Sequence, residues 1–266
     1  MSRVERFYDE HVEHEWGRLE RHRTEFAVTM CALEDYLPPP PAAILDVGGG
    51  PGRYSVALAR RGYAVTLLDI SGSVLAFAEQ KAHELGVELG GLVHGSATDL
   101  CPEQDESFDA VLLMGPLYHL IQPDDRERAL REARRVLKPN GLVFASFITR
   151  YAPILEAARR QPEWILLHRD RCEQLLATGV LTERPGGGFT DAYFATPAEV
   201  CPLLEANGFE TLDLLSAEGV TATVADEIEK LDGEAWEAWV RLNYRLGKDP
   251  SVLGAAFHLL YVGRRG

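Results

Sequence analysis

The stretch Ile44–Tyr54, ILDVGGGPGRY, is the most informative part of this 266-residue chain. It reads as a short apolar strand, a turn with four glycines in five residues, and the first turn of a helix. Glycine lets the backbone adopt left-handed conformations and lets a ligand approach it closely. A helix that begins after such a turn directs backbone N–H groups and the positive end of its dipole at that ligand. The stretch therefore predicts a ligand-binding turn at the carboxyl end of a parallel strand.

Apolar runs alternate with amphipathic segments around this turn, between residues 42 and 150. We interpret the runs as strands buried on both faces and the segments between them as helices. One helix is expected after a Ser71 cap, and another from Asp124 to the breaker segment Lys138–Gly141. This alternation indicates an α/β fold with a parallel sheet and right-handed crossovers. The expected strands are AAILDVG (42–48), YAVTLLDI (63–70), GLVHG (91–95), FDAVLLMG (108–115), GLVFASFIT (141–149), and later 209–215 and 255–262.

The regions that flank this core are expected to be mostly helical. Residues 3–37 have apolar residues at helical spacing and end at four consecutive prolines, which cannot continue a helix. A long insertion follows the core, and a helical segment is expected at 226–246. We predict a single domain over residues 1–266. It divides into a helical lid (1–37), a binding core (42–150), an insertion that forms a substrate wall (151–196) and the C-terminal part of the sheet (197–266).

Charge and cysteine content exclude several classes of protein. The chain has 27 basic and 41 acidic side chains, a net charge of −14, which opposes binding to nucleic acid or to anionic membranes. There is no run of about 18 apolar residues, and the charged N-terminal stretch lacks the apolar centre of a signal peptide, so a cytoplasmic location is expected. The four cysteines form no CxxC pair and are interpreted as buried free thiols; they are Cys31, Cys101, Cys172 and Cys201.

An acidic residue, Asp69, ends the second expected strand about twenty residues beyond the glycine turn. A carboxylate in this place can accept hydrogen bonds from both hydroxyls of a ribose. A dinucleotide site requires the spacing G-x-G-x-x-G, but Arg53 stands where the third glycine is needed. Asp46, inside the strand end, would oppose a pyrophosphate and would suit a ligand with an ammonium group. A nicotinamide-dependent oxidoreductase is therefore disfavoured.

Residues 42–150 resemble the core of the class I S-adenosylmethionine-dependent methyltransferases. The matching segments are ILDVGGGPGRYS (44–55), VTLLDIS (65–71), GSATDL (95–100), FDAVLLMGPLYHL (108–120) and REARRVLKPNGLVFAS (131–146). The resemblance implies a seven-stranded, mostly parallel Rossmann-like sheet with an antiparallel last strand and helices on both faces. It also implies S-adenosylmethionine as the cofactor and S-adenosylhomocysteine as its product, with no metal.

The resemblance assigns a part of the cofactor to each segment. The glycine turn would approach the methionine part, Asp69 would hold the ribose hydroxyls, and Ile70 would lie against the adenine. Ser96 stands where the family often has an acid, so either Ser96 or Asp99 would accept a hydrogen bond from the adenine amino group. The implied cofactor-binding residues are Asp46, Gly48, Gly49, Gly50, Gly52, Asp69, Ile70, Ser96, Ala97, Thr98, Asp99 and Met114.

The chemical step would follow the fourth strand, where Tyr118 and His119 lie by position near the transferable methyl group. His119 is the expected general base and Tyr118 an orienting hydroxyl, the alternative for His119 being a wall residue without a proton role. Tyr8, Trp16 and Arg18 are expected on a helix over the cofactor, and Trp164 and Tyr193 in the substrate wall, with ordinary packing as the alternative for each.

The sequence thus predicts an enzyme that transfers a methyl group by direct displacement to an oxygen or nitrogen atom of a small, aromatic or apolar metabolite. The alternatives are a non-catalytic S-adenosylmethionine-binding module and, less favoured, a nicotinamide-dependent oxidoreductase. The acceptor, the methylated atom and the oligomeric state do not follow from the sequence.

Overall fold

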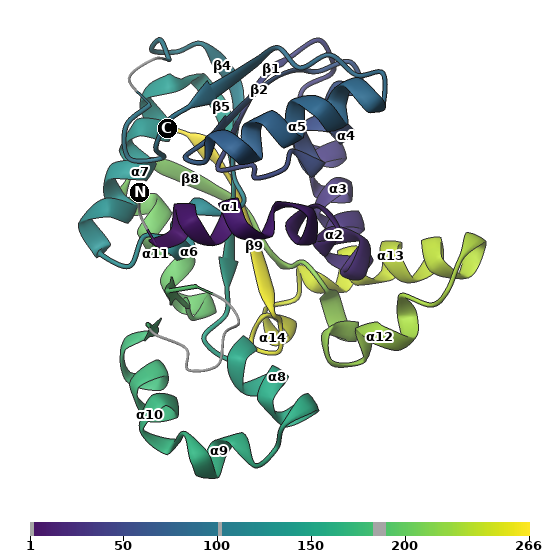
Figure 1. Ribbon diagram of the computed structural model, residues 1–266, viewed down its shortest axis with the longest axis vertical. Helices are drawn as coiled ribbons and strands as arrows, with labels where there is room; N and C mark the ends of the chain where they lie inside the picture. The colour runs from purple at the N-terminus through teal and green to yellow at the C-terminus, as the bar shows by residue number, and fades with distance from the viewer. Residues whose placement is uncertain (1–2, 101–102, 183–189) are drawn as a thin grey trace.

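The computed structural model describes residues 3–100, 103–182 and 190–266. A seven-stranded sheet runs through the centre, with α7 and α11 on one side and α3, α4 and α5 on the other (Figure 1). Cys101, the Pro185–Gly188 run and Phe189 lie outside the described residues.

The sheet has the strand order β3-β2-β1-β4-β5-β9-β8, which confirms the seven-stranded, mostly parallel α/β architecture. The pairs among β1 to β5 are parallel, whereas β9 is antiparallel to both β5 and β8. The chain order reverses between β1 and β4, and ligands of such sheets bind at the carboxyl ends of the strands at this point. The bounds are β1 Ala43–Val47, β2 Ala64–Asp69, β3 Gly91–His94, β4 Phe108–Leu113, β5 Leu137–Ile148, β8 Phe209–Ser216 and β9 His258–Arg265.

Two apolar layers cover the middle strands, one on each face of the sheet. One contains the inward face of α7 and residues of α11, and the other contains α3 together with Ile44, Leu112 and Phe144. β1 and β4 are therefore buried on both faces, as expected. The expectation was wrong for β3, whose residues are half-buried or exposed because it lies at the edge of the sheet.

The helices of the core begin close to the expected residues. α5 (Gly72–Glu84) is capped by Ser71, whose hydroxyl accepts a hydrogen bond from Val74 N at 3.1 Å. α7 (Pro123–Val136) starts as predicted but ends before the Lys138–Gly141 segment, because Leu137 already pairs with β4 as the first residue of β5. The remaining core helices are α4 Arg53–Ala59 and α6 Pro116–His119.

The N-terminal region is helical, as predicted, but divides into α1 (Arg3–Trp16), α2 (Arg18–Arg21) and α3 (Arg23–Tyr36). α3 packs on the sheet and against α13. α1 has no fully buried residue; it contacts α5 and crosses the middle of the molecule between α5 and the insertion (Figure 1). This position leaves α1 free to serve as a cover rather than as part of the core.

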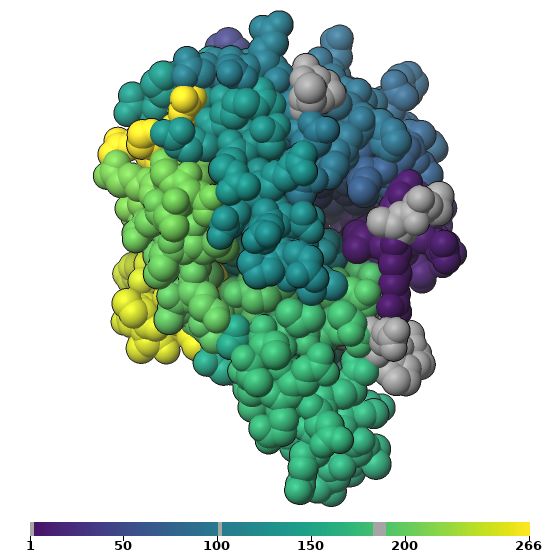
Figure 2. All heavy atoms as spheres, turned by 90° about the vertical axis from the view of Figure 1, so that its left-hand side faces the viewer, coloured from purple at the N-terminus to yellow at the C-terminus, as the bar shows by residue number. Residues whose placement is uncertain are grey.

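The insertion forms α8 (Ala152–Arg160), α9 (Trp164–Leu167), α10 (Arg169–Thr178) and a small hairpin of β6 (Val180–Leu181) with β7 (Ala192–Tyr193). Its helices project as a lobe from one end of the molecule (Figure 2). The C-terminal elements are α11 Pro197–Ala206, η1 Gly219–Val224, α12 Ala225–Ile228, α13 Gly233–Gly247 and α14 Pro250–Leu253.

The structure tests two further expectations, that the cysteines are buried free thiols and that no segment crosses a membrane. Among the three cysteines in the described residues, Cys172 alone is buried as predicted, because Cys31 and Cys201 keep part of their surface exposed; these three are free thiols. Within residues 3–100, 103–182 and 190–266, every helix is too short or too polar to cross a membrane.

Candidate active site

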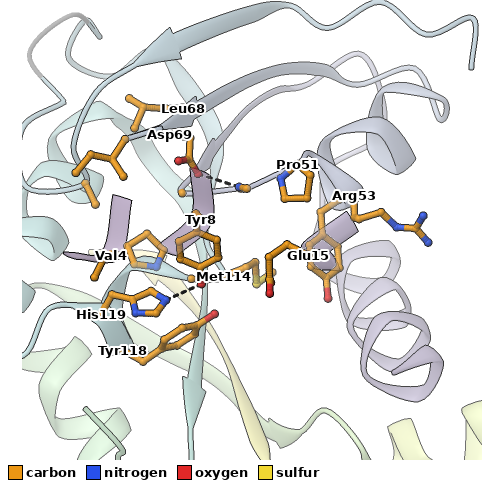
Figure 3. A pocket seen from close by; sticks show the side chains of 18 of the residues that line it. Val4, Tyr8, Glu15, Pro51, Arg53, Leu68, Asp69, Met114, Tyr118 and His119 are labelled. Atoms are coloured by element: carbon orange, nitrogen blue, oxygen red, sulfur yellow. Dashed lines mark hydrogen bonds between the residues drawn. The ribbon is translucent and has the colours of Figure 1, made fainter. Parts of the chain in front are cut away.

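A cavity of about 300 Å³ lies at the carboxyl ends of β1, β2 and β4 (Figure 3). Its floor is the glycine turn, and its sides come from the end of β2, from residues 95–97 and from residues 114–120. α1 and α2 complete it with Val4, Tyr8, Glu15, Arg18 and Leu19. The cavity therefore lies at the topological switch point predicted from the strand pattern.

The glycine turn needs glycine for three different reasons. Gly48 has a φ of +63°, and a Cβ there would lie 2.6 Å from the Pro116 ring. A Cβ on Gly49 would lie 2.5 Å from the Asp46 carboxyl and from Leu67. Gly50 also has a positive φ, +57°, but no described protein atom lies within 4 Å of where its Cβ would be. Gly48 and Gly49 therefore leave no room for a side chain. The backbone at Gly50 is open toward the cavity, so a ligand can contact it.

Asp69 is held at the edge of this turn by two backbone amides. Gly50 N donates to Oδ2 at 3.0 Å, and Ser71 N donates to Oδ1 at 2.9 Å. Burial raises the pKa of Asp69, while the backbone donors oppose that rise. Each carboxylate oxygen can accept more than one hydrogen bond, so the fixed carboxylate can still accept from a pair of ligand hydroxyls.

The residues expected around an adenine divide into two groups. Ile70, Ser96 and Ala97 line the cavity, and Ile70 is exposed over 37% of its surface. Thr98, Asp99 and also Gly52 do not line it. Ser96 Oγ lies 2.9 Å from the hydroxyl of Thr98, so Thr98 contacts Ser96 from behind.

Asp46 lies beneath the glycine turn rather than in the cavity wall. Its side chain is fully buried, and Ser55 Oγ donates to Oδ2 at 2.6 Å. Oδ1 has no hydrogen-bond partner among the described residues. Burial raises the pKa of Asp46 to about 6, so the carboxylate is kept charged at neutral pH at a cost to stability.

Tyr118 and His119 both line the cavity from the short helix α6. His119 Nδ1 lies 3.4 Å from the backbone carbonyl of Asp191, to which it donates, and this leaves Nε2 as an acceptor for the Tyr8 hydroxyl at 2.7 Å. Burial lowers the pKa of His119 to about 4 and raises that of Tyr8. His119 is therefore a neutral imidazole whose basic nitrogen faces the cavity (Figure 3).

Tyr8 and Arg18 line the cavity, whereas the other residues expected in the lid or substrate wall do not. Trp16 lies outside it, under the guanidinium of Arg53, 4.6 Å from the ring centroid. Trp164 lies in α9 of the projecting lobe, beside His168. Tyr193 is covered by the guanidinium of Arg126 at 3.8 Å and donates to Glu199.

Sequence reasoning missed several cavity residues, above all Glu15, Leu19 and Tyr54. It also missed the contact that fixes α1 over the cavity: the hydroxyls of Ser71 and Ser73 both donate to Asp9 Oδ1, the second at 2.6 Å. The only sequence signal for these residues was the amphipathic spacing of residues 3–37, which does not show against which element a helix packs.

Comparison with known proteins agrees with this geometry. Residues 45–145 match a protein family described as a methyltransferase domain. The ubiquinone biosynthesis O-methyltransferase of Caulobacter vibrioides is 33% identical over 123 residues, which are 46% of this chain and 47% of that protein. The chain thus spans about half the length of the curated relatives it matches.

Solved structures resemble the chain over most of its length. A SAM-dependent methyltransferase from Methanosarcina mazei has a TM-score of 0.60 at 22% identity and covers 88% of this chain and 96% of its own. The 1,6-didemethyltoxoflavin-N1-methyltransferase of Burkholderia thailandensis, solved with its namesake compound and S-adenosylhomocysteine, has a TM-score of 0.56 at 16% identity, with 96% and 84% covered. At these identities the likeness shows the fold. Residues 45–145 of this chain thus match a methyltransferase domain in sequence, within a fold that resembles that of a SAM-dependent methyltransferase.

Proposed function

We propose that this protein transfers a methyl group from S-adenosylmethionine to an oxygen or nitrogen atom of a small, largely apolar acceptor. One observation carries the proposal: a single cavity contains the open glycine turn, the fixed carboxylate of Asp69 and the neutral imidazole of His119. The first two match what a nucleoside cofactor requires, and the third is a group that can accept a proton.

The residues present fit this cofactor. The open space above Gly50 gives the ligand access to backbone N–H groups, and Asp69 is placed to accept from the ribose hydroxyls. Ile70 and Ala97 would lie against the adenine, and Met114 near the methionine part. When bound, S-adenosylmethionine supplies an electrophilic methyl group that a nucleophile displaces directly.

His119 would then accept the proton of the acceptor's hydroxyl or amine at Nε2. Because its pKa is about 4, the imidazole stays neutral and available across the physiological pH range. The hydroxyl of Tyr8 is hydrogen-bonded to this nitrogen. Tyr8 must therefore either move aside or relay the proton from the acceptor to His119. A positioned base contributes about 100- to 10,000-fold to the rate when its pKa lies near the operating pH, and a pKa of about 4 places His119 at the lower end of that range.

The covering helix would align the reactants and exclude water. Residues 3–37 would act as a lid, through α1 in particular, because Asp9 ties α1 to the start of α5 and Tyr8 reaches His119. Alignment of two reactants in a closed site is worth up to about 7–11 kcal/mol of the barrier. The apolar lining from Val4, Leu19 and Leu120 favours an acceptor with an apolar or aromatic body.

The test is calorimetric binding of S-adenosylhomocysteine and S-adenosylmethionine, with NAD as the control ligand. Asp69→Ala is expected to lower the affinity for both by about tenfold to a hundredfold, the value of one charge-assisted hydrogen bond. Asp232→Ala, which removes a carboxylate from a side chain that is 87% exposed, should leave binding unchanged. Binding of NAD without binding of either sulfur-containing ligand would overturn the proposal.

A further inference from the structure

Four buried or half-buried charged side chains form a continuous chain beside the cavity. Arg18 donates to both carboxylate oxygens of Glu25, at 2.8 and 3.0 Å. His258 Nδ1 lies 3.7 Å from Glu25 and 2.6 Å from Glu218, and its backbone N–H donates to Glu218 at 3.1 Å. Glu25 and Glu218 are each only 6% exposed. The order Arg18–Glu25–His258–Glu218 therefore alternates in sign from the cavity wall to the start of β9.

The neighbouring charges favour the ionised form of Glu25 and the protonated form of His258. Burial alone would raise the pKa of Glu25, but Arg18 and His258 outweigh it and lower the pKa to about 2. Burial alone would lower the pKa of His258, but Glu25 and Glu218 outweigh it and raise the pKa. Each of the two acidic side chains thus contacts a basic one, so the chain of contacts pairs opposite charges throughout. Desolvating this many charges is costly, whereas their mutual contacts fix the positions of the four side chains.

That geometry fixes Arg18 in the cavity wall. A guanidinium has five N–H donors in a planar fork, and Glu25 uses two of them. Glu15 lines the same cavity, and its carboxylate lies 3.9 Å from Arg18 Nε. In Figure 3, Glu15 lies on the Arg53 side of Met114, whereas Asp69 lies at the top of the view beside the glycine turn.

A fixed guanidinium beside a carboxylate favours ligands that carry a particular combination of charges. Glu15 opposes a simple anion, and Arg18 opposes a simple cation. A group that carries a carboxylate and an ammonium together is attracted by both, and its net charge of zero requires no further compensation. An α-amino acid group has this chemistry.

We propose that Arg18 and Glu15 bind the amino-acid end of the cofactor, Arg18 its carboxylate and Glu15 its ammonium, and that Glu25, His258 and Glu218 are positioning residues for Arg18. This inference rests on the proposed function, because it takes the cofactor from there. It also accounts for the depth of Asp46, which lies beneath the turn and leaves the ammonium to be met from the lid side of the cavity.

Two nucleosides separate this contact from the rest of the site. S-adenosylhomocysteine carries the amino-acid end, and 5′-methylthioadenosine has the same thioether nucleoside without it. In calorimetry on the full chain, Arg18→Gln should weaken S-adenosylhomocysteine binding by about tenfold to a hundredfold and change 5′-methylthioadenosine binding less than twofold. Arg264→Gln removes a comparable ion pair, to Glu210 at 2.8 Å on the outer strands, and should change neither.

Glu15→Gln provides a variant that disturbs the fold little, since the nearest basic side chains, His14 and Arg18, lie 3.6 and 3.9 Å from the Glu15 carboxylate. It should lower only S-adenosylhomocysteine affinity, as should Glu25→Gln through the loosened Arg18. An equal loss for both nucleosides, or full S-adenosylhomocysteine affinity in these variants, would overturn the inference. Wild-type protein that binds neither nucleoside would overturn the proposed function itself, so the two failures are distinguishable.

Discussion

The buried carboxylate of Asp46 is expected to destabilise the ligand-free protein at neutral pH. Its side chain is completely buried, its Oδ1 lacks a partner among the described residues, and burial raises its pKa from 3.8 to about 6. In the unfolded chain the same group titrates near 3.8. Asp46→Asn replaces it with a neutral side chain of the same shape that can still accept from Ser55.

The sign follows from the raised folded pKa. The proton binds more tightly to the folded state, so its contribution to stability is fully present below pH 3.8 and is lost as the pH rises through about 6. Since each pKa unit corresponds to about 1.4 kcal/mol, the whole loss is about 3 kcal/mol. About half of it, roughly 1.4 kcal/mol, falls between pH 5 and pH 8.

Urea unfolding followed by tryptophan fluorescence measures this directly. The free energy of unfolding of Asp46→Asn minus that of the wild type should increase by about 1.4 kcal/mol from pH 5 to pH 8. A constant offset from the new amide group does not affect this difference. If the free energies of unfolding of the two proteins differ by the same amount at every pH from 5 to 8, Asp46 does not have the raised pKa in the folded state.

Three further predictions follow from the site. The imidazole of His119 should titrate near pH 4, measured from its Cε1–H resonance and assigned with His119→Ala; a midpoint above pH 6 would contradict its burial as the controlling factor. Gly49→Ala places a Cβ 2.5 Å from Asp46 and Leu67 and should lower the free energy of unfolding by about 1–3 kcal/mol in urea titrations, so a neutral effect would show that the turn can relax. Asp9→Ala removes the acceptor shared by two serine hydroxyls and should speed amide exchange across α1, with α7 as an internal reference; unchanged exchange would mean that other contacts hold the helix.

Local patterns predicted most of the fold because the physics behind them is local. The apolar runs of β1 and β4 and the Ser71 cap of α5 gave the correct elements close to their observed bounds. Errors arose where tertiary position decides. β3 has an apolar centre but occupies the sheet edge, and Leu137 belongs to β5 because it pairs with Phe108 across the sheet.

The candidate site likewise contains residues that the local sequence predicts and residues that only tertiary packing places. Asp69 and the glycine turn are close in sequence to the strand ends that place them, so their spacing alone predicted a common site. Glu15 enters the cavity because α1 docks on α5, and Arg18, the first residue of α2, lines it while paired with Glu25. Amphipathic spacing could not distinguish the inward Tyr8 from the outward Trp16, and an insertion sequence does not reveal that Trp164 projects away from the cavity.

The place of β9 between β5 and β8 has a consequence for biosynthesis. β5 and β8 are made before β9 but do not pair with each other, because β9 lies between β8 and the edge of β5 that does not face β4. A nascent chain that has reached residue 250 therefore exposes the edges of β5 and β8 that β9 later covers, a condition that invites pairing with other chains. His258, the first residue of β9, also completes the support of Arg18, so sheet closure and assembly of the cavity wall coincide. A chain translated only as far as residue 257 lacks this strand, and the eight residues of β9 complete both the sheet and the support of Arg18.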